Sequence, residues 1–177
     1  MRSSRFVAFK KWSIFILCIF FFSIAQSTVG FLSILGCRPV FLLPLSVGFS
    51  MFLNQKEAAI FGLISGLFWD CFSGRLFGYS SFVLIAVCVF VSLICSYIAH
   101  ASIGNYIILT FVGIFVYNFI DFVFRYMIWN FYGCWDIWIY HIVPTILYTT
   151  LISPLIYLLC KFVFDKFVND KKTNYVQ

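Results

Sequence analysis

The 177-residue chain is 63% hydrophobic and only 10% charged, and its mean hydropathy is +1.03. A water-soluble domain carries about a quarter charged residues, and a soluble core of this size could not bury 25 Phe, 10 Tyr and 5 Trp. The apolar runs are continuous and do not alternate over about ten residues, which excludes a transmembrane barrel. The sequence therefore predicts an all-α integral membrane protein.

The net charge of +6 comes from basic residues that gather at the two ends of the chain and in one short loop. Nine of the twelve Lys and Arg residues lie there: Arg2, Arg5, Lys10, Lys11, Lys56, Lys161, Lys166, Lys171 and Lys172. Basic residues in this arrangement mark the cytoplasmic face of a membrane protein. The charge therefore indicates a lipid bilayer and not a nucleic acid as the partner.

Six apolar segments are predicted as transmembrane helices. Residues 1–11 form a basic cytoplasmic N-terminus, residues 12–164 the six-helix transmembrane domain, and residues 165–177 a polar cytoplasmic tail. The segments cover residues 12–35, 39–53, 58–70, 77–99, 104–130 and 137–164, with kinks expected at Pro144 and Pro154. Nine basic residues on one side, against Arg38 and Arg75 on the other, place both termini in the cytoplasm.

The second and third segments are shorter than the roughly 20 residues that cross the hydrocarbon core. They are either thin spans packed within the protein or a re-entrant pair. The polar hairpins at residues 54–57 and 70–78 favour two spans.

The stretch around the third segment carries most of the specific pattern. Gly62 and Gly66 fall on one helix face, where small residues allow close approach of another helix. Asp70 is expected to end this helix, so the dipole gives it no stabilisation there. A turn containing Ser73, Gly74 and Gly78 follows.

Two other polar positions lie within apolar segments. Asp121 and Arg125 are four residues apart on one face of the fifth helix. They either fix packing near the outer end or contact a partner or a cavity, since ions at membrane depth are candidates for function. Gln26 in the first helix is expected to hydrogen-bond to a neighbouring helix.

No pattern of a catalytic or metal site is visible. The chain has one Glu and two His, and it lacks the zinc-protease, serine-hydrolase and phosphate-loop motifs. We therefore expect no enzyme activity, no cofactor and no metal. The seven Cys form no C-x-x-C pair; a disulfide among Cys37, Cys71 and Cys134 is possible, but free thiols are favoured.

Several of these residues form a pattern that is typical of one family. It comprises Gln26-Ser27, Gly36, Arg38-Pro39 and G-L-x-x-G-L-x-x-D-x-x-S-G-x-x-x-G from Gly62 to Gly78. This pattern resembles the bacterial rod shape-determining protein MreD family over residues 20–100. Val40 departs from it, because the family often has an acid after the proline.

The resemblance implies a non-enzymatic subunit of the cell-elongation complex in the cytoplasmic membrane. Such proteins bind the bitopic protein MreC and help couple MreB filaments to peptidoglycan synthesis. Arg38, Pro39, Asp70, Ser73, Gly74, Gly78, Asp121 and Arg125 are the structural or partner-binding candidates. We expect Asp70 to be satisfied by Arg38, Arg75, the Ser73-Gly74 amides or a partner chain, and to lock the outer ends of helices two to four.

The family also has a six-helix layout similar to the S-components of energy-coupling-factor vitamin transporters. A substrate-binding S-component is therefore the alternative. Such a protein needs convergent polar groups at the outer mouth of a pocket. The outer loops near Arg38, at 70–78 and at 129–136 are short and aromatic with few polar side chains, which favours the scaffold, with no small-molecule substrate expected.

Overall fold

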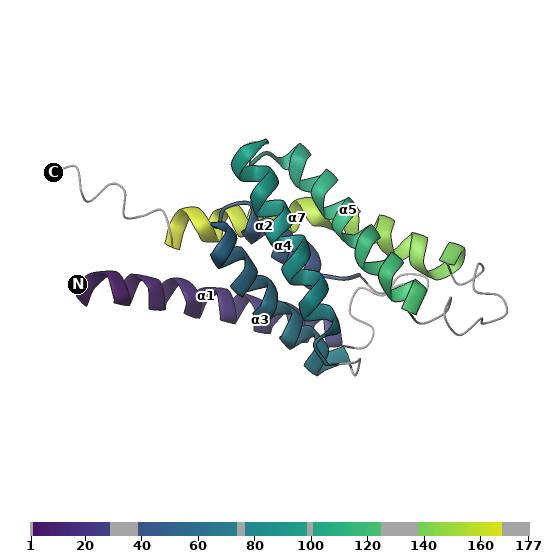
Figure 1. The fold of residues 1–177 in the computed structure, drawn as a ribbon, viewed down its shortest axis with the longest axis horizontal. Coiled ribbons are helices and arrows are strands. Elements are labelled where there is room, and N and C mark those ends of the chain that lie inside the picture. Colours follow the sequence, from purple (N-terminus) through teal and green to yellow (C-terminus); the bar gives the residue numbers. More distant parts are fainter. Residues whose placement is uncertain (1, 29–38, 74–76, 99–100, 125–137, 168–177) are drawn as a thin grey trace.

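The computed structural model describes residues 2–28, 39–73, 77–98, 101–124 and 138–167 (Figure 1). The elements are α1 (Arg2–Ser27), α2 (Leu42–Ser50), α3 (Gln55–Ser73), α4 (Tyr79–Tyr97), α5 (Ile103–Phe122), the π-helical turn η2 (Trp138–Ile142) and α7 (Val143–Phe167). All regular structure in these ranges is helical, which confirms the all-α prediction.

Three helical stretches are long and apolar enough to cross a bilayer, which takes about 20 residues. They are Tyr79–Tyr97, Ile103–Phe122 and Trp138–Lys166, with 19, 20 and 29 residues. The apolar part of α1 is the shorter stretch Lys11–Ser27. The expectation of six spans is thus met in part: the described ranges contain six α-helices, and three helical stretches among them have the length and composition of a span.

Helix α2 lies at the centre of the molecule and contacts each of the five other α-helices. All nine of its residues are buried, as expected of a helix that is apolar on every side. Leu42 and Val47 belong to one apolar cluster, whereas Leu45 and Phe49 belong to a second one. The two clusters therefore meet on α2, which forms the middle of the core.

The expectation that residues 39–53 form a helical span is not met. The helix has nine residues and is about 14 Å long at 1.5 Å per residue, less than half of the hydrocarbon thickness of about 30 Å. The residues before it are non-helical, and those after it form a turn. Burial by neighbouring helices explains why so short a helix is stable in the interior of the protein.

Helix α3 is longer than the predicted segment 58–70. It begins at Gln55 because Ala58 N–H donates to the carbonyl of Asn54 over 2.8 Å, and so the polar 55–57 segment forms the first helical turn. Glu57 is stabilised there by the helix dipole. With 19 residues, α3 is about 28 Å long, and Asp70 lies in its last turns instead of ending it.

Helices α3 and α4 form a tightly packed hairpin, and the glycines of α3 face α4. A Cβ atom at Gly66 would overlap the backbone of Ser81 and would lie 2.6 Å from its nitrogen. A Cβ atom at Gly62 would lie 2.9 Å from the carbonyl oxygen of Leu84. The two backbones therefore approach each other at the positions where the sequence has glycine.

The two prolines of the sixth segment stand where the helix is locally adapted. Pro144 is the second residue of α7, immediately after η2, a turn with π-helical geometry, and Val143. Pro154 lies inside α7 and leaves the Thr150 carbonyl without its helical N–H donor. The Ser153 hydroxyl donates to that carbonyl over 2.8 Å, as serine side chains do for broken helical bonds in membranes.

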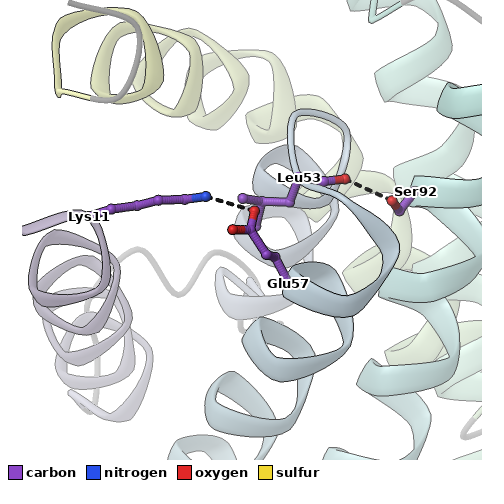
Figure 2. Close-up of polar contacts among 4 residues, drawn as sticks. All are labelled: Lys11, Leu53, Glu57 and Ser92. Atoms are coloured by element: carbon purple, nitrogen blue, oxygen red, sulfur yellow. Dashed lines mark hydrogen bonds and ion pairs between the residues drawn. The ribbon is translucent and has the colours of Figure 1, made fainter. Parts of the chain in front are cut away.

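The N-terminal end of α1 and the C-terminal end of α7 lie toward the same end of the molecule (Figure 1). The Lys11 ammonium group forms a 2.7 Å ion pair with the carboxylate of Glu57 there (Figure 2). Close by, the Ser92 hydroxyl donates to the Leu53 carbonyl over 2.8 Å. This proximal end thus joins α1, α3 and α4; the opposite end is called the distal end below.

We predict that replacing the glycines of α3 by alanine destabilises the protein to different degrees. Gly66→Ala should lower the apparent melting temperature of the detergent-solubilised protein most, because its methyl group meets the backbone of α4, and Gly62→Ala should lower it less. Gly104→Ala is the matched control: nothing lies within 4 Å of its Cβ, and alanine is favoured over glycine in helices by about 1 kcal/mol. Equal melting temperatures for the Gly66 and Gly104 variants would contradict the close packing.

Candidate functional site

A buried carboxylate at the distal end organises the hairpin of α3 and α4. Asp70 is only 3% exposed. Its two oxygens accept hydrogen bonds from Gly78 N–H over 2.8 Å and from Ser80 N–H over 3.2 Å. The Ser81 hydroxyl lies 3.5 Å from the same carboxylate. Asp70 of α3 thus satisfies backbone donors at the start of α4.

This bond pattern arises because α4 has no cap of its own. Its N-cap residue is Gly78, which has no side chain and a φ of +95°, a conformation that glycine adopts without strain. The first N–H groups of a helix lack partners within the helix. Asp70 supplies the missing acceptor from the preceding helix.

Of two expectations about Asp70, its bonds to Arg38, Arg75 or the Gly74 amide stay a prediction, and the dipole argument needs correction. Its described partners are Gly78, Ser80 and Ser81, whereas Arg38, Arg75 and Gly74 lie outside the described residues. The dipole argument was wrong because it considered only α3. The carboxylate lies at the N-terminus of α4, where the positive end of the dipole favours a negative group.

The cluster extends to α5 through a buried tyrosine. The hydroxyl groups of Ser80 and Tyr117 are 3.0 Å apart. The Tyr117 ring stacks on Trp69, with centroids 4.5 Å apart and planes inclined by 21°. Residues Trp69, Asp70, Ser80, Ser81 and Tyr117, here called the distal cluster, therefore connect the distal ends of α3 and α4 with α5.

A second set of bonds caps α2 in the same manner. Its N-cap position holds Phe41, whose side chain cannot accept a hydrogen bond. Gln26 of α1 accepts from Phe41 N–H and Leu42 N–H over 2.9 and 3.1 Å. Thr149 of α7 accepts from Val40 N–H over 3.2 Å. Gln26 thus bonds to the start of a neighbouring helix, as the sequence predicts.

The described polar groups of these networks bond mainly to other helices of the same chain. The acceptors on Asp70, Gln26 and Thr149 are directed at backbone amides, and the hydroxyl groups of Ser46 and Ser65 bond to each other over 3.0 Å. Within the described ranges, no three His, Cys, Asp or Glu residues are grouped as a metal site would require.

The remaining sequence-predicted residues are distributed as follows. Pro39 is buried ahead of α2, and Ser73 is exposed at the end of α3. Asp121 is half-buried in the last turn of α5; Arg125 lies outside the described residues, so their pairing stays a prediction. The preference for free thiols over a disulfide among Cys37, Cys71 and Cys134 also stays a prediction. Of these three residues only Cys71 is described, and it is an exposed free thiol.

Sequence reasoning missed Thr149, Ser80 and Tyr117 as members of these networks. One signal was available: Gly78 precedes an apolar helix with no Asp or Asn at its start. A helix that begins in a membrane without a capping side chain needs a hydrogen-bond acceptor from another part of the protein.

In the part of the chain that the structure describes, six α-helices with three apolar stretches able to cross a bilayer define an integral membrane protein. Residues 4–167 match the family model described as rod shape-determining protein MreD. The chain belongs to this family of rod shape-determining proteins, so the family prediction is confirmed. The match extends well beyond the resemblance over residues 20–100. No curated protein and no solved structure matches the chain.

We predict that Asp70→Asn destabilises the protein. The asparagine side chain offers one carbonyl oxygen, so either the part-buried N–H of Gly78 or the buried N–H of Ser80 loses its acceptor. Leaving a buried donor unpaired costs about 1–3 kcal/mol. The apparent melting temperature in mild detergent measures this loss. Asp170→Asn makes the same charge change in the C-terminal tail and should leave the melting temperature unchanged; equal values for both variants would contradict the capping role.

Proposed function

We propose that this protein is a non-enzymatic scaffold subunit of the bacterial cell-elongation complex. It binds the bitopic membrane protein MreC and helps couple cytoplasmic MreB filaments to peptidoglycan synthesis and cell-shape control. The observation that carries the proposal is the family match over residues 4–167.

The character of the interior supports a scaffold. Large side chains such as Tyr106, Tyr117, Phe15, Phe49 and Phe61 fill it and are fully buried. Its polar groups largely bond to one another, as in the Tyr106 hydroxyl that donates to the Pro44 carbonyl over 2.9 Å. A dense interior of this kind holds a fixed shape for binding other proteins.

The arrangement of charges supports a location in the cytoplasmic membrane with both termini in the cytoplasm. Lys11 and Glu57 pair at the proximal end, where α1 begins and α7 ends (Figure 1). Lys56 and Lys161 are exposed residues of α3 and α7. Basic residues at one end are the usual sign of the cytoplasmic side.

Cysteine labelling tests this topology. In a background with Cys37, Cys71 and Cys134 replaced by Ser, Ser73→Cys should react with a membrane-impermeant maleimide in intact cells. Asn54→Cys, at the proximal end, should react only after the membrane is opened. Labelling of the Asn54 position in intact cells would place the proximal end outside and refute the proposed orientation.

The distal cluster provides a test of the scaffold. Asp70→Asn weakens the bonds that hold α3, α4 and α5 together, and should therefore reduce the recovery of MreC with the affinity-purified protein while membrane insertion continues. In cells that rely on this variant, rods should become rounder. Asp170→Asn is the matched control for charge and should preserve both MreC recovery and cell shape.

The same variant distinguishes the scaffold from an S-component. If the protein were an S-component, Asp70→Asn would reduce the uptake of one small nutrient and would leave the shape of the cells unchanged. Full MreC recovery by the Asp70→Asn protein together with loss of such uptake would overturn the scaffold proposal and favour the transporter.

A further inference from the structure

The last turns of α7 form a hollow with a mixed polar and apolar lining at the proximal end. It has a volume of about 500 Å³ and is lined by Leu158, Lys161, Phe162, Asp165 and Lys166. The ammonium group of Lys166 lies over the Phe162 ring, 5.2 Å from its centroid. All five side chains are exposed in the described structure. The hollow therefore combines two cations, one anion and an apolar wall at the end of an apolar helix.

An apolar stripe on the same face of α7 leads into this hollow. Leu151, Leu155, Leu158 and Phe162 follow each other at intervals of four, three and four residues, and each is more than half exposed. This spacing keeps them on one side of the helix. The stripe is therefore continuous with the hollow, since Leu158 and Phe162 belong to both.

We propose that this face of α7 binds an anionic phospholipid, with an acyl chain along the stripe and a phosphodiester headgroup in the hollow. Lysine side chains near a membrane surface extend their ammonium groups to the headgroup level, and basic pockets at the cytoplasmic side bind anionic headgroups. With Lys161, Lys166 and Asp165, the hollow has a formal charge of +1, which complements the single negative charge of a lipid such as phosphatidylglycerol. This inference is independent of the proposed scaffold function.

A second copy of the chain is the less suitable occupant. Two parallel α7 helices that pair along the stripe would place Lys161 opposite Lys166 of the other copy, five residues further on, as in a two-stranded coiled coil. The two Asp165 side chains would also face each other. Like charges at both positions oppose such a dimer, whereas a phosphate group between the lysines is attracted to both.

Native mass spectrometry of the full-length protein tests the site. The delipidated protein in detergent is titrated with phosphatidylglycerol and, separately, with phosphatidylcholine. We expect tighter binding of phosphatidylglycerol at one site. The double variant Lys161→Gln/Lys166→Gln should bind phosphatidylglycerol with an affinity that is lower by about tenfold or more, because each basic residue near the headgroups contributes about 1 kcal/mol. Asp165→Asn should tighten the binding instead, since it removes the one negative charge.

Lys171→Gln/Lys172→Gln is the matched control for charge, because it removes two charges from the C-terminal tail and changes no residue of the described lining of the hollow. It should bind phosphatidylglycerol as the unaltered protein does, and all variants should elute as folded protein. Equal binding of the two lipids, or equal losses in both double variants, would overturn the proposal. A lipid-free dimer that dissociates when Lys161 and Lys166 are replaced would assign the face to a second copy instead.

Discussion

The structure depends on how helix ends are satisfied where water is absent. A soluble helix that begins without a capping side chain can bond its first amides to water, but a helix end inside a membrane protein cannot. Here α4 follows Gly78 and α2 follows Phe41, neither of which has a capping side chain. Asp70 and Gln26 supply the acceptors from other helices. Each helix start is thereby tied to a neighbour, and tertiary structure and helix formation stabilise each other.

The central position of α2 has a consequence for the whole molecule. A helix of nine buried residues has too few residues to cross the bilayer, and its amides and carbonyls need partners on several sides. Gln26, Thr149 and Tyr106 provide them from α1, α7 and α5, and Gly62 and Gly66 let α4 close against α3. Because five helices converge on α2, a change in any one of them shifts the surface that the others present. This rigid coupling suits a protein whose proposed role is to hold partners in a fixed relation.

Composition and periodicity were sufficient to predict the helical class, the fourth and sixth segments, and the glycine positions at which two helices approach. The fifth segment was predicted over its described part, whereas its expected end near residue 130 lies outside the described residues. Composition and periodicity did not predict the ends of α2 and α3. Pro39 to Leu53 is apolar throughout, and hydrophobicity alone does not tell a complete span from a short helix buried by its neighbours. The role of Asp70 was predicted only in part: the sequence indicated a turn beyond it, but the helix that it caps begins nine residues later, at Tyr79. Such a relation depends on how α3 and α4 fold back on each other, which is a tertiary property.

A protein whose interior groups are engaged with one another acts through its exterior. The described bonds of the distal cluster join α3, α4 and α5 and fix their relative positions. The proximal end differs, since exposed lysines and an apolar stripe on α7 are directed away from the core. The proposed lipid site thus lies on a surface that is chemically distinct from the one that the distal cluster shapes. Separate ends for lipid and for protein would let the membrane orient the molecule through its basic end while the distal surface stays free for assembly.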